Sequence, residues 1–247
     1  MDRLYSRHGV RESLRARRRT FQKLLVADGV EDAPVLREIL RLAQQARVPV
    51  QNARRDALNQ VTPHHQGVML EAGAYPYCEI DDIFAVAQLR AEPPFILVLD
   101  ALQDPQNFGS LIRTAEAVGV HGVVIPERRS AGVTPAVVNA SSGAVEHMRV
   151  AQVVNLARAI DEIKKRDVWV SALDGGERAT PIFGADLKGA LAIVVGSEGE
   201  GVHRLVREKA DFVLKLPMRG QIESLNAAVA GSVALYEALR QRQTPAP

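Results

Sequence analysis

Short apolar runs rich in β-branched residues recur through the second half of the chain. They lie at residues 95–99 (FILVL), 122–126 (GVVIP), 168–173 (VWVSAL), 191–196 (LAIVVG) and 212–217 (FVLKLP). Runs that are apolar at consecutive positions are typical of strands buried on both faces of a sheet. Between them lie helical patterns, such as the one-sided stripe of Phe108, Leu111, Ile112, Ala115 and Gly119. This alternation predicts an α/β fold with a parallel sheet over residues 95–242.

The first part of the chain has shorter elements. Its pattern predicts a basic helix near residues 8–18, a strand at 22–26, a helix near 33–46 and short strands near 48–50 and 67–71. Pro93 and Pro94 follow an acidic stretch, and consecutive prolines favour a stiff connector over helix. We therefore predict a small α/β domain at residues 1–86, a linker at 87–94 and a larger domain at 95–247.

Composition narrows the class of protein. The 247 residues are 47% hydrophobic and 24% charged, with a formal net charge of +2, which excludes disorder as the main state. No apolar run is long enough to span a bilayer, and the N-terminus lacks the apolar core of a signal peptide. Cys78 is the single cysteine, so an internal disulfide and a cysteine-based zinc site are excluded. We expect a cytoplasmic protein without a membrane partner.

The net charge of the whole chain is close to zero, but its N-terminal segment is basic. Arg7, Arg11 and Arg15 recur at every fourth position and would share one face of a helix, which Arg18 or Arg19 would extend. Such a stripe attracts phosphate, and therefore nucleic acid. A solvated helix face without a ligand is an equally good interpretation of the charges alone.

Common catalytic motifs are absent. The chain has no GxxxxGK[ST] phosphate-binding loop and no GxSxG nucleophile elbow. GSEGEG at residues 196–201 lacks the GxGxxG order and follows the fourth strand of the large domain, which argues against a dinucleotide-dependent oxidoreductase. No metal site is predicted, because His64 and His65 have no neighbouring acidic or cysteine ligands.

Three segments stand out beyond what local structure requires. In DPQNFGSLIRTAEAVG (104–119), Arg113 lies off the apolar stripe and can project into a site. In VVGSEGEG (194–201), a strand ends in glycines that allow a ligand to approach the backbone, although an ordinary turn would look the same. In the third segment (216–241), Ser224 is the predicted N-cap of the last helix and Asn226 lies in its first turn. The small residues that follow require close packing against the sheet, a second subunit or both.

In order and spacing, these segments resemble the three signature motifs of the SpoU/TrmH-type RNA ribose 2′-O-methyltransferases. The resemblance extends over residues 95–242, and the first domain is similar to that family's ribosomal-protein-like RNA-binding extension. Among subgroups, the chain is most similar to the enzymes that methylate a guanosine ribose of bacterial 23S rRNA. The resemblance implies a deep C-terminal trefoil knot, a feature that general folding rules disfavour. It also implies a homodimer that packs through the last helix.

The resemblance implies S-adenosylmethionine as cofactor. The residues that would bind it are Gly196, Leu216 and Leu225, with help from the backbone of Glu198, Gly199, Met218 and Ser224. The catalytic motif residues of the family correspond here to Asn107, Arg113, Glu198, Ser224 and Asn226. The family assigns Arg113 to deprotonation of the ribose 2′-hydroxyl. A guanidinium stays protonated, however. The reaction would equally require Arg113 if it stabilised the developing alkoxide or bound the adjacent phosphate.

Other functions stay open at this point. A tRNA ribose methyltransferase would carry the same motifs, although the basic first domain favours structured rRNA. A non-catalytic RNA-binding protein of the same fold is a further alternative, against which the intact set of five motif residues argues. The RNA partners that we expect are therefore rRNA ahead of tRNA, with Arg7, Arg11, Arg15, Arg18 and Arg113 as contacts.

Overall fold

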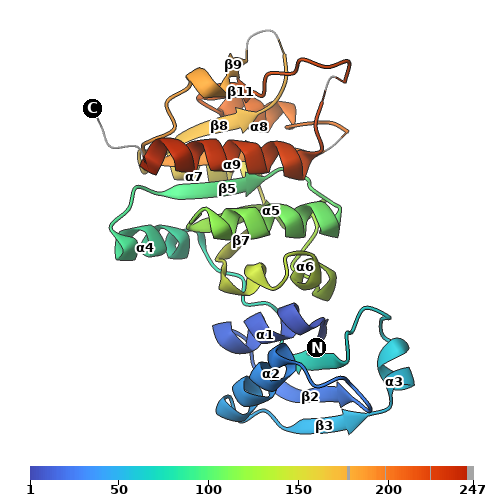
Figure 1. Cartoon of the computed structure of the whole chain (residues 1–247). Coiled ribbons are helices and arrows are strands. Elements are labelled where there is room, and N and C mark those ends of the chain that lie inside the picture. The colour runs from blue at the N-terminus through green and yellow to red at the C-terminus, as the bar shows by residue number, and fades with distance from the viewer. Residues whose placement is uncertain (177–178, 198, 223, 244–247) are drawn as a thin grey trace. The chain divides into compact units, whose positions relative to one another are not determined.

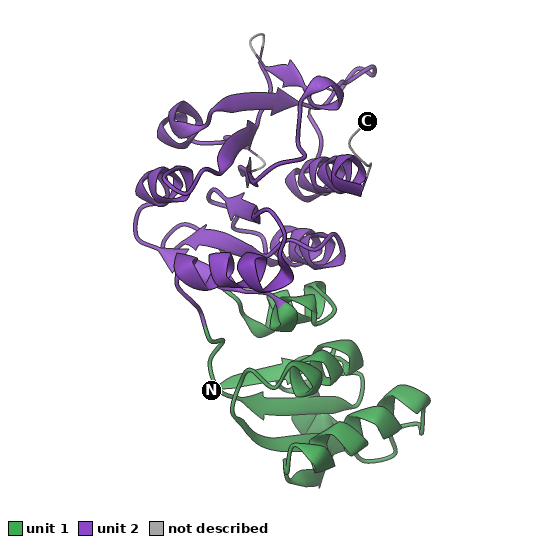
Figure 2. Ribbon diagram, turned by 90° about the vertical axis from the view of Figure 1, so that its left-hand side faces the viewer, with its two compact units in different colours: residues 1–76, 133–147 green, residues 77–132, 148–247 purple. Residues whose placement is uncertain are grey.

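The computed structural model describes residues 1–176, 179–197, 199–222 and 224–243. Its contacts divide the chain into two compact units, coloured separately in Figure 2. Unit 1 comprises Met1–Pro76 together with Val133–His147, and unit 2 comprises Tyr77–Gly132 together with Met148–Pro247. This division differs from the boundary expected at residue 86, because the first unit ends earlier and recruits a later segment.

Unit 1 is built on a four-stranded sheet in the order β1-β4-β2-β3. β2 pairs in parallel with β3, and β4 runs antiparallel to both β1 and β2. The strands are β1 (Asp2–Tyr5), β2 (Phe21–Ala27), β3 (Val50–Ala53) and β4 (Val68–Ala72), and the helices from this part of the chain are α1 (Arg7–Ala16), α2 (Pro34–Gln45) and α3 (Arg55–Asn59). The predicted elements of this region are present, whereas β1 and α3 were not predicted.

The segment Val133–His147 belongs to unit 1 although it lies far along the chain. It forms α6 (Pro135–Ala140) and the 3₁₀ helix η1 (Ala144–His147). The side chain of Glu146 is fully buried and accepts two hydrogen bonds from the equally buried guanidinium of Arg19, at 3.0 and 2.7 Å. Arg19 also donates to Asp2 at 2.7 Å and stacks over Tyr75. Buried charges of this kind are stable only as a paired set, so the segment is an integral part of the unit.

Unit 2 contains a seven-stranded sheet in the order β7-β6-β5-β10-β8-β11-β9, in which every neighbouring pair is parallel. The strands are β5 (Phe95–Leu99), β6 (Gly122–Pro126), β7 (Val150–Val153), β8 (Trp169–Leu173), β9 (Thr180–Pro181), β10 (Leu191–Val195) and β11 (Phe212–Lys215). The predicted parallel sheet is therefore confirmed, and all five predicted apolar runs are strands. β7 and β9 are short and were not predicted.

Helices cover both faces of this sheet (Figure 1). The helices are α4 (Ile80–Arg90), α5 (Pro105–Ala117), α7 (Leu156–Lys164), α8 (Arg204–Lys209) and α9 (Ala227–Gln243), with the 3₁₀ helix η2 (Ile182–Gly184) after β9. One core layer joins α4, α7 and α8 to alternate strand positions such as Ile96 and Val194. On the other face α5 packs beside α9, where a Cβ on Gly231 would come within 2.8 Å of Leu111 and 3.1 Å of Val195.

α4 occupies much of the expected linker. Its start has a reciprocal capping box in which Glu79 accepts from the backbone of Asp82 and Asp82 accepts from the backbone of Glu79. The helix buries Ile80 and Ile83 against the sheet and runs to Arg90. Only the four residues between Arg90 and Phe95 connect it to β5. The acidic stretch is therefore part of unit 2 and not a spacer before it.

The order of the strands places three chain segments at one edge of the sheet. β10 lies between β5 and β8, and β11 lies between β8 and β9, so late strands are inserted between earlier ones. Because all strands are parallel, the segments after Leu173, Val195 and Lys215 leave the sheet at the same edge. In open α/β sheets, ligands bind in crevices outside the carboxyl ends of the strands.

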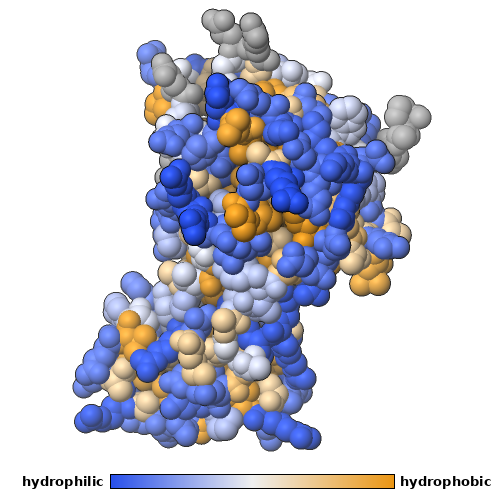
Figure 3. Space-filling view, turned by 180° about the vertical axis from the view of Figure 1, so that it is seen from behind, coloured by the Kyte–Doolittle hydropathy of each residue, from blue (hydrophilic) through white to orange (hydrophobic). Residues whose placement is uncertain are grey.

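The surface carries apolar side chains in separate patches. Figure 3 shows several of them on a mainly hydrophilic face, the one turned away from the viewer in Figure 1. Isolated exposed residues such as Leu89, Val154 and Leu205 are normal for a protein surface. Within the part of the chain that the structure describes, no helix has the length and hydropathy needed to cross a membrane.

Candidate active site

A cavity of about 430 Å³ lies at the carboxyl ends of β8, β10 and β11 and at the start of α9. Its volume is within the usual range for small-molecule sites. Four chain segments supply its lining: Leu173, Asp174 and Gly175 after β8; Val195, Gly196, Ser197, Gly199, Glu200 and Gly201 after β10; Leu214, Lys215, Leu216 and Met218 at the end of β11; and Ser224, Leu225, Ala227 and Ala230 at α9.

This cavity brings together residues that the sequence analysis assigned to one cofactor. Gly196, Gly199, Leu216, Met218, Ser224 and Leu225 all line it. The wall after β8 was not among the predicted residues. Its sequence signal was an apolar strand that ends in Asp174, Gly175 and Gly176, the same arrangement of strand and glycine that drew attention to residues 196–201.

The two ends of the glycine-rich segment, Gly196–Ser197 and Gly201, lie close together. Ser197 and Gly201 exchange backbone hydrogen bonds of 3.1 and 3.0 Å, and Gly201 has a positive φ of 64°. A Cβ on Gly196 would lie 2.1 Å from the carbonyl carbon and oxygen of Gly201. Glycine is therefore required at position 196 by the close approach of two backbone segments. This tight turn leaves one side of the loop free to form the wall of the cavity.

Asn226 connects α9 to α5. Its Oδ1 accepts hydrogen bonds from the backbone N–H groups of Ala228 and Val229, and its Nδ2 donates to Oδ1 of Asn107 at 3.0 Å. Asn226 is therefore the N-cap of α9, and the prediction that Ser224 caps this helix is wrong. Ser224 is exposed and lies three residues before the helix begins, at the cavity.

Arg113 lies on the exposed side of α5, as its position off the apolar stripe predicted. The helix is held at its start by Asp104, whose carboxylate accepts from the backbone N–H groups of Gln106 and Asn107. Asn107 follows in the first turn and Arg113 lies almost two turns further along the same helix. Glu198, the remaining predicted catalytic residue, lies outside the described residues.

A buried carboxylate supports the segment beyond the glycine-rich loop. Asp100, which directly follows β5 and is 5% exposed, accepts from the backbone N–H of His203 at 2.7 Å. Its other oxygen lies 3.0 Å from Nδ1 of the same histidine. These contacts fix the start of α8 against the end of β5. They position the returning end of the loop without contributing a group to the lining of the cavity.

The four N-terminal arginines that were expected to contact RNA do not form an open cationic face. Arg11 and Arg15 both form ion pairs with Glu12 and Glu38, and Arg7 donates to backbone carbonyls of Gln66 and Glu31. α1 ends at Ala16 because Arg17 adopts a left-handed conformation, so Arg18 cannot extend the helical stripe. Arg18 instead donates to the hydroxyl of Tyr75 and to nearby carbonyl groups.

The pKa of Glu12, whose carboxylate faces Arg11 and Arg15, is also shifted. Burial alone would raise the pKa of Glu12, but hydrogen bonds from His147 and Arg11, together with the charge of Arg15, hold it below its usual value. A carboxylate with a lowered pKa is ionised at neutral pH and neutralises its arginine neighbours. A phosphate would have to displace it in order to use the same arginines.

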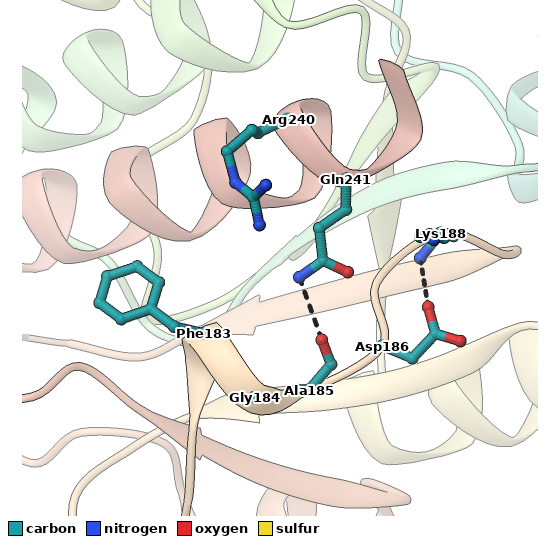
Figure 4. Close-up of a pocket in the computed structure, with 7 residues that line it drawn as sticks. All are labelled: Phe183, Gly184, Ala185, Asp186, Lys188, Arg240 and Gln241. Atoms are coloured by element: carbon teal, nitrogen blue, oxygen red, sulfur yellow. Dashed lines mark hydrogen bonds between the residues drawn. The ribbon is translucent and has the colours of Figure 1, made fainter. Parts of the chain in front are cut away.

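A second, smaller cavity of about 370 Å³ lies between the loop after β9 and the end of α9 (Figure 4). Its lining consists of Phe183, Gly184, Ala185, Asp186, Lys188, Arg240 and Gln241. Gln241 donates to the carbonyl of Ala185 at 3.0 Å, and Arg240 is paired with Glu237 at 2.8 Å. No residue predicted for catalysis or cofactor binding lines it.

Within the described ranges, no group of three or more histidine, cysteine, aspartate or glutamate residues is arranged to hold a metal ion.

Two protein families match the chain. The SpoU rRNA Methylase family matches residues 94–236, and the family described as RNA 2′-O ribose methyltransferase substrate binding matches residues 4–78. The first match contains the cavity and the Asn107–Asn226 pair, and the second contains most of the sheet of unit 1. Together they cover most of the chain in the same order as the two predicted parts.

Curated relatives and solved structures agree with these matches. A protein of Bacillus subtilis (strain 168), YacO, named as a TrmH family tRNA/rRNA methyltransferase, is 44% identical over 98% of this chain and 96% of its own length. The crystal structure of the SpoU methyltransferase AviRb from Streptomyces viridochromogenes superimposes with a TM-score of 0.80 at 26% identity, covering 98% of this chain and 89% of that chain. A structure of AviRb with the cofactor AdoMet has a TM-score of 0.79 at 24% identity, covering 97% and 90%. The chain therefore belongs to the SpoU methylase family of RNA methyltransferases, as its three motifs predicted.

Proposed function

We propose that this protein transfers a methyl group from S-adenosylmethionine to a ribose 2′-hydroxyl of RNA. The observation that carries the proposal is the convergence of three strand ends and the start of α9 on one cavity, directly beside the Asn107–Asn226 pair. Family membership supports S-adenosylmethionine as the cofactor, and the AviRb structure holds that cofactor in the same fold. We also expect the enzyme to act in the cytoplasm, where its RNA substrates are made.

The cavity suits this cofactor in shape and in chemistry. Apolar side chains of Leu173, Leu216 and Leu225 offer a surface for a flat base, and backbone groups of the tight 196–201 loop are close enough to bind its polar edges. Ser197 and Ser224 add hydroxyl groups at the lining. When bound, S-adenosylmethionine supplies a methyl group on a positively charged sulfur, which is electrophilic without a metal ion.

The residues on α5 and α9 would act on the RNA. As the 2′-hydroxyl reacts, negative charge develops on its oxygen, and the guanidinium of Arg113 would stabilise that charge or grip the adjacent phosphate. Arginine is a poor general base because it is effectively always protonated. Asn107 and Asn226 would hold the two helix starts in register, and Ser224 and Glu198 complete the proposed catalytic set.

Substitution of Arg113 tests this mechanism. Arg113→Ala should fold normally, bind S-adenosylmethionine in calorimetry with EDTA present, and lose methyl transfer by about 10³-fold, because its positive charge acts in the transition state. Arg113→Lys keeps the charge but loses the planar fork, so it should restore little activity. Near wild-type turnover by Arg113→Ala would remove this residue from the mechanism, and absence of cofactor binding by the wild-type protein would overturn the proposed function.

We propose an rRNA substrate, specifically a guanosine of 23S rRNA, with tRNA as the alternative. The match of residues 4–78 to a substrate-binding family supports unit 1 as the part that selects the RNA. The names of the relatives include both tRNA and rRNA. Ribose methylation mapped on total RNA from cells with and without the protein distinguishes the two: the site that loses its methyl group identifies the substrate.

The trefoil knot of the C-terminal segment is also part of our proposal. It is supported by the insertion of β10 between β5 and β8, and of β11 between β8 and β9, which brings the segments after those strands around the same cavity. A knotted arrangement would explain why the last helix begins at the cavity wall formed by earlier strands. Slow refolding from the denatured state, compared with rapid recovery of helical signal, would support it.

A homodimer is supported by an apolar stripe on α9. Val229, Val233 and Tyr236 are 50, 38 and 54% exposed, at spacings that place them on one face. The opposite face of the helix is buried on α5 and the sheet. An exposed stripe of this kind is typical of an interface between copies of a chain. Val229→Glu should yield monomers in light scattering after gel filtration, whereas Val154→Glu, at an isolated exposed position, should leave the assembly unchanged.

A further inference from the structure

The loop after β6 carries two adjacent arginines at the same edge of the sheet as the cavity. Arg128 and Arg129 are both exposed, and within the described ranges neither of them forms an ion pair. Other arginines of unit 2 do form ion pairs, for example Arg207 with Asp174 and Arg166 with Asp81. Together with the adjacent exposed carboxylate of Glu127, the two guanidinium groups leave the loop with a net positive charge.

The backbone of this loop is held firmly at both ends. The N–H of Glu127 donates to the carbonyl of Val153 at 3.0 Å. On the other side, the carbonyl of Leu102 accepts from the hydroxyl of Ser130 at 3.2 Å and from the N–H of Ala131 at 2.8 Å. The arginines are therefore presented by an anchored loop and not by a long free segment.

The backbone between these anchors is strained. Arg129 has a positive φ of 61°, in the left-handed region that a non-glycine residue rarely occupies. Ala101, in the neighbouring loop that supplies Leu102, has a positive φ of 58°. Other non-glycine residues of the chain, such as Arg17 and Ala91 at helix ends, share this conformation, so at Arg129 it marks a tight turn of the loop. An arginine at such a position has a conformational penalty that a glycine or asparagine would avoid.

The anchor at Leu102 places the loop beside the catalytic helix. Leu102 lies two residues before Asp104, which caps α5, the helix that carries Asn107 and Arg113. In the order of the strands, β6 is next to β5 on the side away from β10 and β8. Strands are spaced by about 4.8 Å, so the loop is roughly 10–15 Å across the edge from the cavity. At that separation the loop is within reach of the RNA backbone close to a target ribose at the cavity.

We propose that Arg128 and Arg129 form a phosphate-binding loop that grips the RNA backbone beside the target nucleotide, a role that rests on the proposed function. Guanidinium groups bind phosphate through paired N–H···O bonds, which fix orientation as well as adding affinity. Such contacts position RNA without reading its sequence. Unit 2 would then contribute to substrate binding directly, in addition to the selection made by unit 1.

The test uses a double variant of the full chain, Arg128→Gln with Arg129→Asn, because asparagine tolerates the left-handed backbone. The control is Arg158→Gln with Lys165→Gln, which removes two exposed charges at α7, on the face of the sheet opposite to α5. The probe is total RNA from cells that lack the protein, and transfer of labelled methyl groups and filter binding are measured at several salt concentrations.

The loop variant should bind RNA about tenfold more weakly. The slope of log K against the logarithm of the salt concentration should become less steep by about one to two, because two phosphate contacts are lost. The KM for RNA should rise, while kcat at saturating RNA and the affinity for S-adenosylmethionine stay close to wild type. An unchanged salt dependence, or an equal loss in the control variant, would overturn the proposal. If the wild-type protein transfers no methyl group to any RNA, the proposed function fails, and the salt dependence of binding still decides whether the loop contacts phosphate.

Discussion

Asn226 donates from Nδ2 to Oδ1 of Asn107 at 3.0 Å while its own Oδ1 caps the last helix. One side chain therefore fixes the start of α9 and also ties it to the first turn of α5. The cavity lies on one side of this contact, because Leu225 and Ala227 line it. The amide of Asn226 therefore links the wall of the cavity to α5, in addition to the hydrogen bond between Thr114 and Ser232 further along the two helices.

Two substitutions should separate these roles. Asn226→Ala removes the cap and the contact with Asn107, so the free energy of unfolding should fall by about 1 kcal/mol. Asn226→Ser keeps a capping oxygen but is too short to reach Asn107, so its stability should stay near wild type. We expect both variants to lose methyl transfer by about 100-fold, because small displacements of positioned groups have effects of this size. Normal turnover by Asn226→Ser would show that the contact with Asn107 has no catalytic role.

Gly196→Ala should damage cofactor binding. The added methyl group would lie 2.1 Å from the carbonyl of Gly201, so the loop would have to open. We expect the affinity for S-adenosylmethionine, measured by calorimetry, to fall at least about tenfold, because the backbone groups of the wall would be displaced. Gly189→Ala is the matched control, since a Cβ there meets no atom within 4 Å. Equal affinities of the two variants would contradict this explanation of the glycine.

The ion pair between Arg19 and Glu146 should dominate the stability of unit 1. Both side chains are fully buried, so Glu146→Gln would leave Arg19 without its principal counter-charge. Removing one partner of a buried pair typically destabilises a protein by about 3–5 kcal/mol. Asp32→Asn removes one partner of an exposed pair, Arg37–Asp32, and should cost less than about 1 kcal/mol. Chemical denaturation of both variants checks the contrast, and similar shifts would refute it.

His121 should make the stability of unit 2 depend on pH. Burial lowers its pKa, and the hydrogen bond with Glu92 opposes that effect only in part. In the neutral ring, Nδ1 accepts from the N–H of Phe95 at 2.9 Å, a bond that protonation would break. Because the folded state binds the proton less readily than the unfolded state, stability should be full above pH of about 6.5 and fall as the pH decreases below it.

Two variants test this dependence. His121→Gln should flatten the change in unfolding free energy between neutral and mildly acidic pH. Glu92→Gln should steepen it, because the carboxylate that raises the pKa of the histidine is lost. Unfolding midpoints measured at a series of pH values give the slopes. Identical slopes in wild type and His121→Gln would assign the dependence to other groups.

Five of the seven strands of unit 2 could be predicted, because their apolar runs reflect local burial alone, whereas the short β7 and β9 have no such run. Phe95–Leu99 and Gly122–Pro126 are strands over the ranges that their apolar runs indicated. The helix α4 was missed although its signal was present, since Asp81 and Asp82 in the first turn are typical of a helix start. Because Pro93 and Pro94 indicated a connector, the predicted linker began at residue 87, whereas α4 continues to Arg90.

The other differences between the sequence predictions and the structure depend on contacts between residues that are far apart in the chain. The charges of Arg11 and Arg15 are neutralised in part by Glu38, which comes from α2, and no local pattern shows that pairing. Serine and asparagine are both good N-caps, so the sequence alone does not decide between Ser224 and Asn226. The structure shows that Asn226 also donates a hydrogen bond to Asn107, which lies more than a hundred positions earlier in the chain. The predicted cofactor-binding residues could be named only through the family resemblance, and those that the structure describes line one cavity.

The return of residues 133–147 to unit 1 has a consequence for how the protein is made. Glu146, which neutralises Arg19, leaves the ribosome only after β5, α5 and β6 of the other unit have been synthesised. Until then Arg19 has Asp2 as a counter-charge but lacks its fully buried partner, and the nascent N-terminal unit lacks α6 and η1. Folding during translation therefore cannot proceed strictly from the first unit to the second, and a ribosome that stalls near residue 130 would hold a chain in which neither unit is complete.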